Sequence, residues 1–225
     1  MIELEFCKRD DLRYQQIRNR HYVPNSGTHG QQLHFLVWYE RQIAGIISGA
    51  SSVYGVKARD EFFKFSSVRK EKESLYLPAV INNTVFRLET HEPNLGTKVL
   101  ALWRKTVASL WEEMYGVPII GFETFVVENE SRKGSMYKAD NWTFVGETAG
   151  STKKHGVGGA KAKAERLKTD KKLIFCRWAK HPIVPKTRYV GCWRNETPEE
   201  KLKLKTIKLY RESLLGKTWP WRHVK

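Results

Sequence analysis

The feature of this sequence that most constrains its fold is a long amphipathic segment followed at once by a strongly apolar one. Apolar side chains recur at spacings of three and four residues from Leu100 to Met114, which predicts a helix with one buried face that ends at Gly116. Pro118 then leads into residues 119–127, which are apolar enough for a strand buried on both faces. Because such a strand needs packing partners on both sides, the sequence predicts a sheet flanked by helices.

Segments before and after this pair predict the rest of the architecture. Asp10 and Asp11 precede a short capped helix, and strands are expected over 33–39, 42–50 and 79–89. The further elements expected are a loop or insertion over 59–74, a short helix over 133–139, strands over 142–146 and 172–178, and a C-terminal helix that begins with the capping box Thr197–Glu200. This order predicts an α/β or α+β fold with a mixed central sheet, in which the long and the short helix cover the two faces of 119–127.

The charge of the chain is distributed very unevenly. There are 40 Lys and Arg residues against 24 Asp and Glu, a formal net charge of +16. Residues 1–150 hold 19 basic and 18 acidic side chains, a net of +1, whereas residues 151–225 hold 21 basic and 6 acidic, a net of +15. We therefore expect a core over 1–180, with a basic loop over 150–171 inside it, and a basic C-terminal helical arm over 181–225 that binds a polyanion.

Basic side chains of this last third are expected to contact phosphates, although a solvated basic tail is the alternative. They are Lys153, Lys154, Lys161, Lys163, Arg166, Lys168, Lys171, Lys172, Lys201, Lys205 and Lys208. The N-terminus lacks the basic and apolar regions of a signal peptide, and the apolar stretch around 43–53 is too short to span a bilayer. The three cysteines form no C-x-x-C pair. The sequence thus predicts a soluble cytoplasmic protein without a membrane partner.

The segment 135–146, SMYKADNWTFVG, resembles the signature that closes the acyltransferase core of the GNAT superfamily. Within that fold, several segments resemble the Mom family of phage DNA-modification proteins: 17–22, 30–34, 47–51, 80–83, 86–89, 121–126 and 137–142. This resemblance implies a GNAT-like fold that attaches a carbamoylmethyl group to the exocyclic amine of adenine in double-stranded DNA. The modification would protect phage DNA from host restriction in the bacterial cytoplasm.

Three other functions are compatible with the same residues. Related domains in bacterial antiphage systems share several of the quoted pieces, so a defence-system relative is one alternative. A nucleic-acid-binding module without catalysis is a second. The third is an acyl- or aminoacyltransferase that acts on RNA.

Acyl transfer needs a base for the attacking amine and an acid for the leaving group. The resemblance implies that Tyr137 protonates the leaving group, while a packed core tyrosine is the alternative. Glu123 lies inside the apolar run, so it must be paired, protonated or bound to a metal. Its alternative is an ion pair with Arg87 or another base. Asn82 and Asn83 are expected to read a base edge or orient the acyl group, or else to repair a bulge in the sheet.

The remaining catalytic candidates have weaker support. Arg87 could clamp a carboxylate or phosphate, or could pair with Glu89 or Glu123. Tyr54, Asp140 and Ser135 are candidates from segment similarity alone.

The acyl donor is expected at the start of the long helix. GNAT members bind the pyrophosphate of acetyl-CoA with a glycine-rich turn there, whereas residues 92–98 of this chain contain a single glycine. Asn94, Gly96, Thr97 and Lys98 are the candidates for phosphate binding. Because the usual turn is missing, both a CoA-type donor and a charged tRNA stay open.

The Mom resemblance also implies a dependence on iron. Two neutral imidazoles with a carboxylate such as Glu123 would suit that metal, and His21 and His34 are the candidate ligands. Neither histidine belongs to an H-x-H or H-x-x-x-E pair. Two separately hydrogen-bonded histidines are therefore the alternative.

Overall fold

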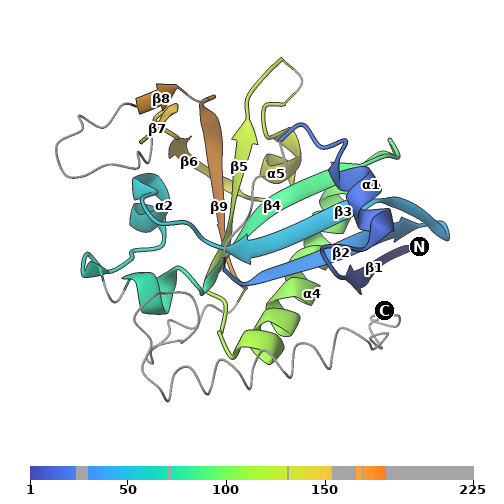
Figure 1. Cartoon of the computed structure of the whole chain (residues 1–225), viewed down its shortest axis with the longest axis horizontal. Helices are drawn as coiled ribbons and strands as arrows, with labels where there is room; N and C mark the ends of the chain where they lie inside the picture. Colours follow the sequence, from blue (N-terminus) through green and yellow to red (C-terminus); the bar gives the residue numbers. More distant parts are fainter. Residues whose placement is uncertain (24–29, 70–71, 131, 154–165, 169, 181–225) are drawn as a thin grey trace.

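Seven strands form one mixed sheet at the centre of the molecule, in the order β1-β2-β3-β4-β5-β9-β6 (Figure 1). The structure is a computed structural model that describes residues 1–23, 30–69, 72–130, 132–153, 166–168 and 170–180. The strands are β1 Ile2–Cys7, β2 Gln32–Tyr39, β3 Gln42–Ser51, β4 Val80–Leu88, β5 Gly121–Val127, β6 Thr143–Glu147 and β9 Lys172–Trp178. All neighbours are antiparallel except β4 and β5, which are parallel. The expected mixed sheet flanked by helices is confirmed.

The long helix follows the expected pattern closely. Helix α4, Leu95–Tyr115, ends at Gly116, which adopts a left-handed conformation with φ of 66°. Its apolar stripe is fully buried, with Trp103, Val107 and Trp111 each at 0% exposure. This stripe packs against the inner face of the sheet and forms the larger core of the molecule. Most of the apolar area that stabilises the fold is buried here.

The other face of the sheet is covered by two short helices, α1 Leu12–Arg18 and α2 Lys57–Phe62. Helix α2 packs over β6 and β9, and Phe63 directly after it reaches β5. A Cβ atom at Gly121 would come within 2.3 Å of the Phe63 ring, so only glycine allows this approach. The expectation that 133–139 covers this face is wrong. Helix α5, Ser135–Ala139, lies beside α4 on the opposite face, where the Tyr137 hydroxyl meets Thr124.

Two further parts of the chain differ from the expectations. The stretch 59–74 is a loop only in part, because α2 extends into it as far as Phe62 and the π-helix η1, Lys72–Tyr76, begins in it. Helix α2 has only six residues and too few apolar side chains for a helical period, which explains the error. Strand β1 was not expected, although its sequence IELEFC alternates apolar and acidic residues as an edge strand does.

The basic third of the chain is described only in part. Two short strands, β7 Ser151–Lys153 and β8 Arg166–Lys168, pair antiparallel within the expected loop over 150–171. The helix expected from Thr197, and the whole arm over 181–225, lie outside the described residues. Within the described ranges, no helix has the length and apolarity needed to cross a bilayer.

Candidate active site

Strands β4 and β5 are parallel neighbours that pair over only part of their length. Residues 80–83 of β4 pair in register with 121–124 of β5. The last pair is Asn83 with Thr124, and beyond it the strands separate although each continues for several residues (Figure 1). We call this place the strand opening. Polar side chains from β4, β5 and α5 meet at it.

The hydroxyl of Tyr137 lies at the strand opening. It donates a hydrogen bond to Asn83 Oδ1 at 2.8 Å. Thr124 Oγ1 lies 3.1 Å from the main-chain oxygen of Asn83 and 3.4 Å from the Tyr137 hydroxyl. Burial raises the pKa of Tyr137 far above its ordinary value, and the nearby Thr124 hydroxyl offsets only part of that effect. The phenol therefore keeps its proton and is suited to act as an acid rather than a base.

Local packing places this tyrosine. Gly134 precedes α5 with φ of 71°, and a Cβ atom there would lie 2.3 Å from the Phe175 ring. The ring of Phe175 from β9 stacks on Tyr137 with the ring centroids 6.0 Å apart. A side chain at position 134 would displace Phe175, so glycine is required for α5 to sit this close to the sheet.

Asn83 also closes an irregularity in the sheet. The register of β3 on β4 shifts between Ser48 and Gly49. Asn83 Nδ2 donates to the main-chain oxygens of Ser48 at 3.0 Å and Val85 at 3.2 Å, which are the last register pair before this shift. Its amide nitrogen therefore repairs the bulge, while its amide oxygen accepts from the Tyr137 hydroxyl. The two roles expected for this residue are compatible.

Glu123 lies on the other face of β5, at 0% exposure. Its Oε2 accepts a hydrogen bond of 2.7 Å from Arg59 Nη1, so its partner is the fully buried Arg59 of α2 and not Arg87. Arg59 Nε continues to Asp60 Oδ1 at 2.7 Å, and Asp60 Oδ2 accepts from Lys72 Nζ at 2.8 Å. Burial raises the pKa of Glu123, and the Arg59 guanidinium opposes this rise.

Arg87 holds main chain rather than facing the strand opening. Its Nε lies 2.5 Å from Glu89 Oε1, which is one of its expected pairings, and its Nη1 donates to the main-chain oxygen of Arg20 at 2.6 Å. Residues 20–23, which we call the strap, follow α1. The His21 side chain hydrogen-bonds with the main chain of β4 at Phe86, and the Tyr22 side chain with that of β5. The strap therefore bridges the strand opening.

Three of the expected catalytic residues, Asp140, Ser135 and Tyr54, have surroundings other than the strand opening. The Asp140 carboxylate accepts from Arg104 Nε at 2.8 Å and Nη2 at 2.7 Å, and from Trp142 Nε1 at 2.8 Å. It thereby ties α4 to the segment after α5. Ser135 is exposed at the start of α5. Tyr54 is 47% exposed near α2, with two basic groups 5.4 and 5.5 Å from its ring centroid.

The four expected donor-binding residues lie at the start of α4. Asn94 caps the helix with φ of 61° and no side-chain hydrogen bond, and Thr97 and Lys98 lie in the first turn. A Cβ atom at Gly96 would lie 2.5 Å from Met136 Sδ, so this glycine allows α4 and α5 to approach each other. Packing therefore explains the glycine, and phosphate binding at this turn stays a prediction.

The two candidate iron ligands are separately hydrogen-bonded. His34 Nδ1 lies 3.0 Å from Ser48 Oγ, which also contacts the Tyr14 hydroxyl at 2.8 Å. His21 Nδ1 accepts from the Val23 amide at 3.1 Å, and burial lowers the pKa of His21 to about 4. In the part of the chain that the structure describes, no three His, Cys, Asp or Glu side chains gather as a metal ion would need. These residues do not fit the expected iron site.

Five of the basic residues expected on DNA are described. Lys153 in β7 is the register partner of Arg166 in β8, which also contains Lys168. Lys171 is exposed and lies 3.9 Å from a Glu147 oxygen, and Lys172 begins β9. The others lie outside the described residues: Lys154, Lys161, Lys163, Lys201, Lys205 and Lys208.

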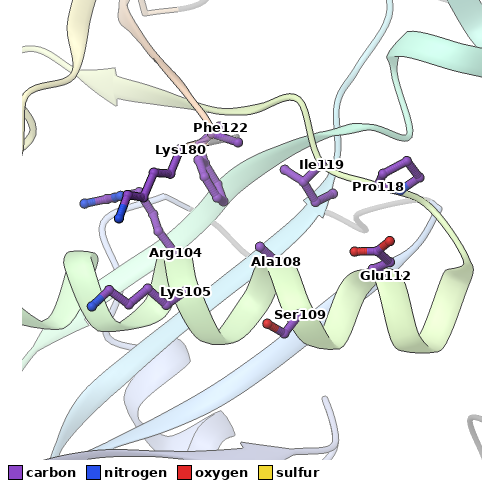
Figure 2. Close-up of a pocket in the computed structure, with 10 residues that line it drawn as sticks. Arg104, Lys105, Ala108, Ser109, Glu112, Pro118, Ile119, Phe122 and Lys180 are labelled. Carbon is purple, nitrogen blue, oxygen red and sulfur yellow. The ribbon is translucent and has the colours of Figure 1, made fainter. Parts of the chain in front are cut away.

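A groove of about 250 Å³ lies between α4 and the start of β5 (Figure 2). Ile119 and Phe122 provide apolar lining. The two ends carry opposite charges, with Arg104, Lys105 and Lys180 at one and Glu112 at the other (Figure 2). Neither Tyr137 nor Glu123 borders this groove, so it is separate from the strand opening.

Sequence reasoning missed three residues of this site. Thr124 stands beside Glu123, and strand alternation alone places the two on opposite faces. Arg59 is separated from Glu123 by 64 positions, and no local pattern reveals such a pairing. Tyr22 lies within a quoted segment, but its contact with β5 depends on the path of the strap.

Comparison with solved structures finds acetyltransferases of low sequence identity. NAA60 of Arabidopsis thaliana, solved with acetyl-CoA, is 12% identical over 80% of this chain and 100% of its own, with a TM-score of 0.49. RimL, the ribosomal L7/L12 alpha-N-protein acetyltransferase, is 9% identical over 65% of this chain and 69% of its own, with a TM-score of 0.39. Aminoglycoside 6'-acetyltransferase type Ii is 9% identical over 75% and 76%, with a TM-score of 0.37. Scores this low carry no argument about activity.

Comparison with curated protein sequences gives no significant match. One family of sequences does match: the family described as Druantia protein DruA, over residues 3–174. This range runs from β1 into β9 and contains Asn82, Asn83, Glu123 and Tyr137. The chain therefore belongs to the DruA family, and not to the Mom family that its motifs resemble.

Proposed function

We propose that this protein is an acyltransferase whose acceptor is an amine of a nucleic acid. The observation that carries the proposal is the Tyr137 hydroxyl, held by Asn83 and Thr124 where β4 and β5 separate. A protonated phenol fixed at a gap between two strands can deliver its proton to the leaving group as the bond from the acyl carbon breaks. Its raised pKa keeps the proton available until that step.

The charge of the chain supports a nucleic acid as the acceptor. The net charge of +15 over residues 151–225 suits phosphate contact and counterion release. The exocyclic amine of adenine in double-stranded DNA is the first acceptor to test, and amines of RNA are the second. An amine inside a duplex is inaccessible, so the base must flip out of the stack, which costs a few kcal/mol that phosphate contacts offset. A CoA thioester or a charged tRNA is the donor class.

Nucleoside mass spectrometry tests the proposal. DNA and RNA from cells that express the full chain should contain a mass-shifted nucleoside, and Tyr137→Phe should abolish it. Tyr115→Phe is the matched control, since it removes another phenol hydroxyl, one that contacts Gln32 far from the strand opening. Acyl transfer would be refuted if the nucleosides stay unmodified in both the DNA and the RNA of these cells, and also when the purified protein is supplied with either class of donor.

A nucleic-acid-binding module without catalysis is the second candidate, and the strap favours it. Arg132 lies 4.1 Å from the ring centroid of Tyr22, so the residue that spans the strand opening is held from both sides. If the strap stays over the strand opening, no substrate can reach the Tyr137 hydroxyl, and the fold then serves binding alone. This candidate predicts binding to duplex DNA with no change in nucleoside mass in either pool.

A further inference from the structure

The groove between α4 and the start of β5 has an apolar middle (Figure 2). Helix α4 contributes Ala108, which is half-buried, and the opposite wall contains Ile119 and Phe122. Pro118 extends this lining toward the last turns of α4. A ligand that covers the middle of the groove must therefore have an apolar part.

Four cations lie at or beside one end of the groove, which we call the cationic end. Arg104, Lys105 and Lys180 line it (Figure 2). Arg177, the fourth, extends from β9 to the main-chain oxygen of Asp140, whose carboxylate accepts from Arg104. Burial lowers the pKa of Arg177, and the positive charge of Arg104 adds to this effect. The two guanidinium groups are therefore close enough to repel each other.

A single carboxylate offsets the charge of the cationic end. Asp140 Oδ1 lies 2.7 Å from Arg104, whose side chain is 16% exposed. In the ranges that the structure describes, no other Asp or Glu forms an ion pair with any of the four cations. Four basic side chains against one acidic side chain leave a clear excess of positive charge. A phosphate, which has several acceptor oxygens, would offset this excess through charge-assisted hydrogen bonds.

Glu112 lies at the opposite end of the groove (Figure 2). Its side chain is exposed, and it is seven residues beyond Lys105 on α4, which is about 10 Å along the helix axis. An ionised carboxylate accepts hydrogen bonds and donates none. A ligand that fits the whole groove therefore has an anionic group at one end, an apolar part in the middle and N–H donors at the other end.

We propose that this groove binds one nucleotide, with its phosphate at the cationic end and an amino group of its base donating to Glu112. A nucleotide has these parts in the required order, and the face of its base covers the apolar middle. Arginine and lysine bind phosphate, and glutamate accepts from the amino group of cytosine. The volume of about 250 Å³ suits one nucleotide and excludes a duplex. The nucleotide is either free or an unpaired member of a single strand.

This site goes beyond the proposed acyl transfer and does not depend on it. The groove is separate from the strand opening, and Tyr137 does not border it. Binding at the groove is therefore measured without any acyl donor. A result that overturns the nucleotide site leaves the outcome of nucleoside mass spectrometry unchanged.

Calorimetric titration of the full chain with deoxycytidine monophosphate tests the site. This nucleotide should bind about tenfold more tightly than inorganic phosphate or deoxycytidine, because each of these lacks the part that one region of the groove contacts. Ala108→Leu fills the apolar middle without changing a charge, so it should weaken binding of the nucleotide and leave binding of phosphate unchanged. Equal affinity for phosphate and nucleotide would show an anion site alone and overturn the proposal.

Charge variants test the position of the phosphate. Lys105→Gln combined with Lys180→Gln removes two exposed cations from the cationic end, and the affinity for deoxycytidine monophosphate should fall about tenfold. Lys57→Gln combined with Lys64→Gln is the matched control, because it removes the same charge from two exposed lysines at α2, on the other face of the sheet. Equal losses in the two double variants would mean general attraction to a basic protein and contradict the site.

The base preference tests the role of Glu112. Thymidine monophosphate has an oxygen where deoxycytidine monophosphate has an amino group, so a carboxylate favours the second nucleotide. The wild type should bind deoxycytidine monophosphate more tightly, and Glu112→Leu should remove the preference. The same affinity of the wild type for both nucleotides would refute the assigned orientation.

Competition distinguishes the two sources of the nucleotide. A single-stranded oligomer of deoxycytidine should displace labelled deoxycytidine monophosphate if the groove takes an unpaired nucleotide of a strand. If the groove takes the free nucleotide, the oligomer should leave it bound. Absence of binding by the full chain, for the mononucleotide and the oligomer alike, overturns the proposal.

Discussion

Asn83 and Glu123 lie on neighbouring strands one register position apart, and distant parts of the chain hold them. Asn83 is fixed by the main chain of Ser48, and Glu123 by the guanidinium of Arg59. Asn82, Asn83 and Glu123 were identified as candidates because a polar side chain in an apolar strand must have a partner or a function. Tyr137 was identified from the motif resemblance. Their partners could not be predicted, because a hydrogen bond over 35 or 64 positions leaves no local pattern.

The buried ion pair leads to a stability prediction. Arg59→Met leaves the Glu123 charge without its partner, so the free energy of unfolding should fall by about 3–5 kcal/mol. Urea unfolding of the full chain measures this change. Arg69→Met is the control, because Arg69 is paired with Glu73 on the surface and its loss should change stability little. Equal effects of the two substitutions would contradict a buried pair.

His21 gives the protein a pH dependence in mild acid. Burial lowers its pKa from 6.5 to about 4, so the folded state binds fewer protons than the unfolded state between these values. Stability from this group is fully present above pH 6.5 and is lost as the pH falls toward 4. Urea unfolding at pH 5 and 7 should show a smaller difference for His21→Gln than for the wild type. The carboxylates with lowered pKa, Asp11, Glu40 and Glu89, also lose stability as the pH falls past their ordinary values of 3.8 and 4.5, and pH 5 lies above both values.

Elements with strong periodicity were predicted well from the sequence. The helix Leu95–Tyr115 and the strands Gly121–Val127 and Lys172–Trp178 follow from apolar spacing. Helix α2 was missed because it is short and because Arg59 and the following Phe63 pack against Glu123 and Gly121, which lie 64 and 58 positions away in the sequence. Tertiary packing therefore decides the elements that local propensity leaves undetermined.

Substitutions at the contact between α4 and α5 test whether Gly96 is needed for packing or for cofactor binding. Gly96→Ala places a methyl group against Met136, and we expect destabilisation of about 1 kcal/mol because the methionine can move. Met136→Ala in the same chain should restore most of this loss, which thermal unfolding of the double mutant measures. If Gly96 instead approaches a donor phosphate, the double mutant regains stability and still binds the donor weakly.

At the scale of the whole molecule, the charge divides the chain into a nearly neutral part, residues 1–150, and a basic part, residues 151–225. The change of charge at residue 150 is not the edge of the sheet, because β9 belongs to the sheet although it lies in the basic third, and the expected core over 1–180 includes this strand. Deletion of 151–225 would therefore remove a strand that pairs with both β5 and β6. A boundary after residue 180 keeps every strand of the seven-stranded sheet.

Deletion of 181–225 tests the basic arm. This segment holds 11 basic and 4 acidic residues, so its loss should weaken binding to duplex DNA and flatten the dependence of affinity on salt. Fluorescence anisotropy at two salt concentrations measures both effects. The unfolding midpoint of the shortened chain serves as the control for folding. If the affinity and its dependence on salt are both unchanged, either residues outside 181–225 bind the DNA or the protein does not bind DNA.

The position of β9 between β5 and β6 also sets an order of events during synthesis. Strand β6 pairs only with β9 in the sheet, and the outer edge of β5 is open until β9 arrives. Once residue 150 has emerged from the ribosome, β5 and β6 therefore have unpaired edges, which are prone to associate with other chains. Pausing or truncation before residue 172 should favour aggregation, whereas emergence of residue 178 closes the sheet.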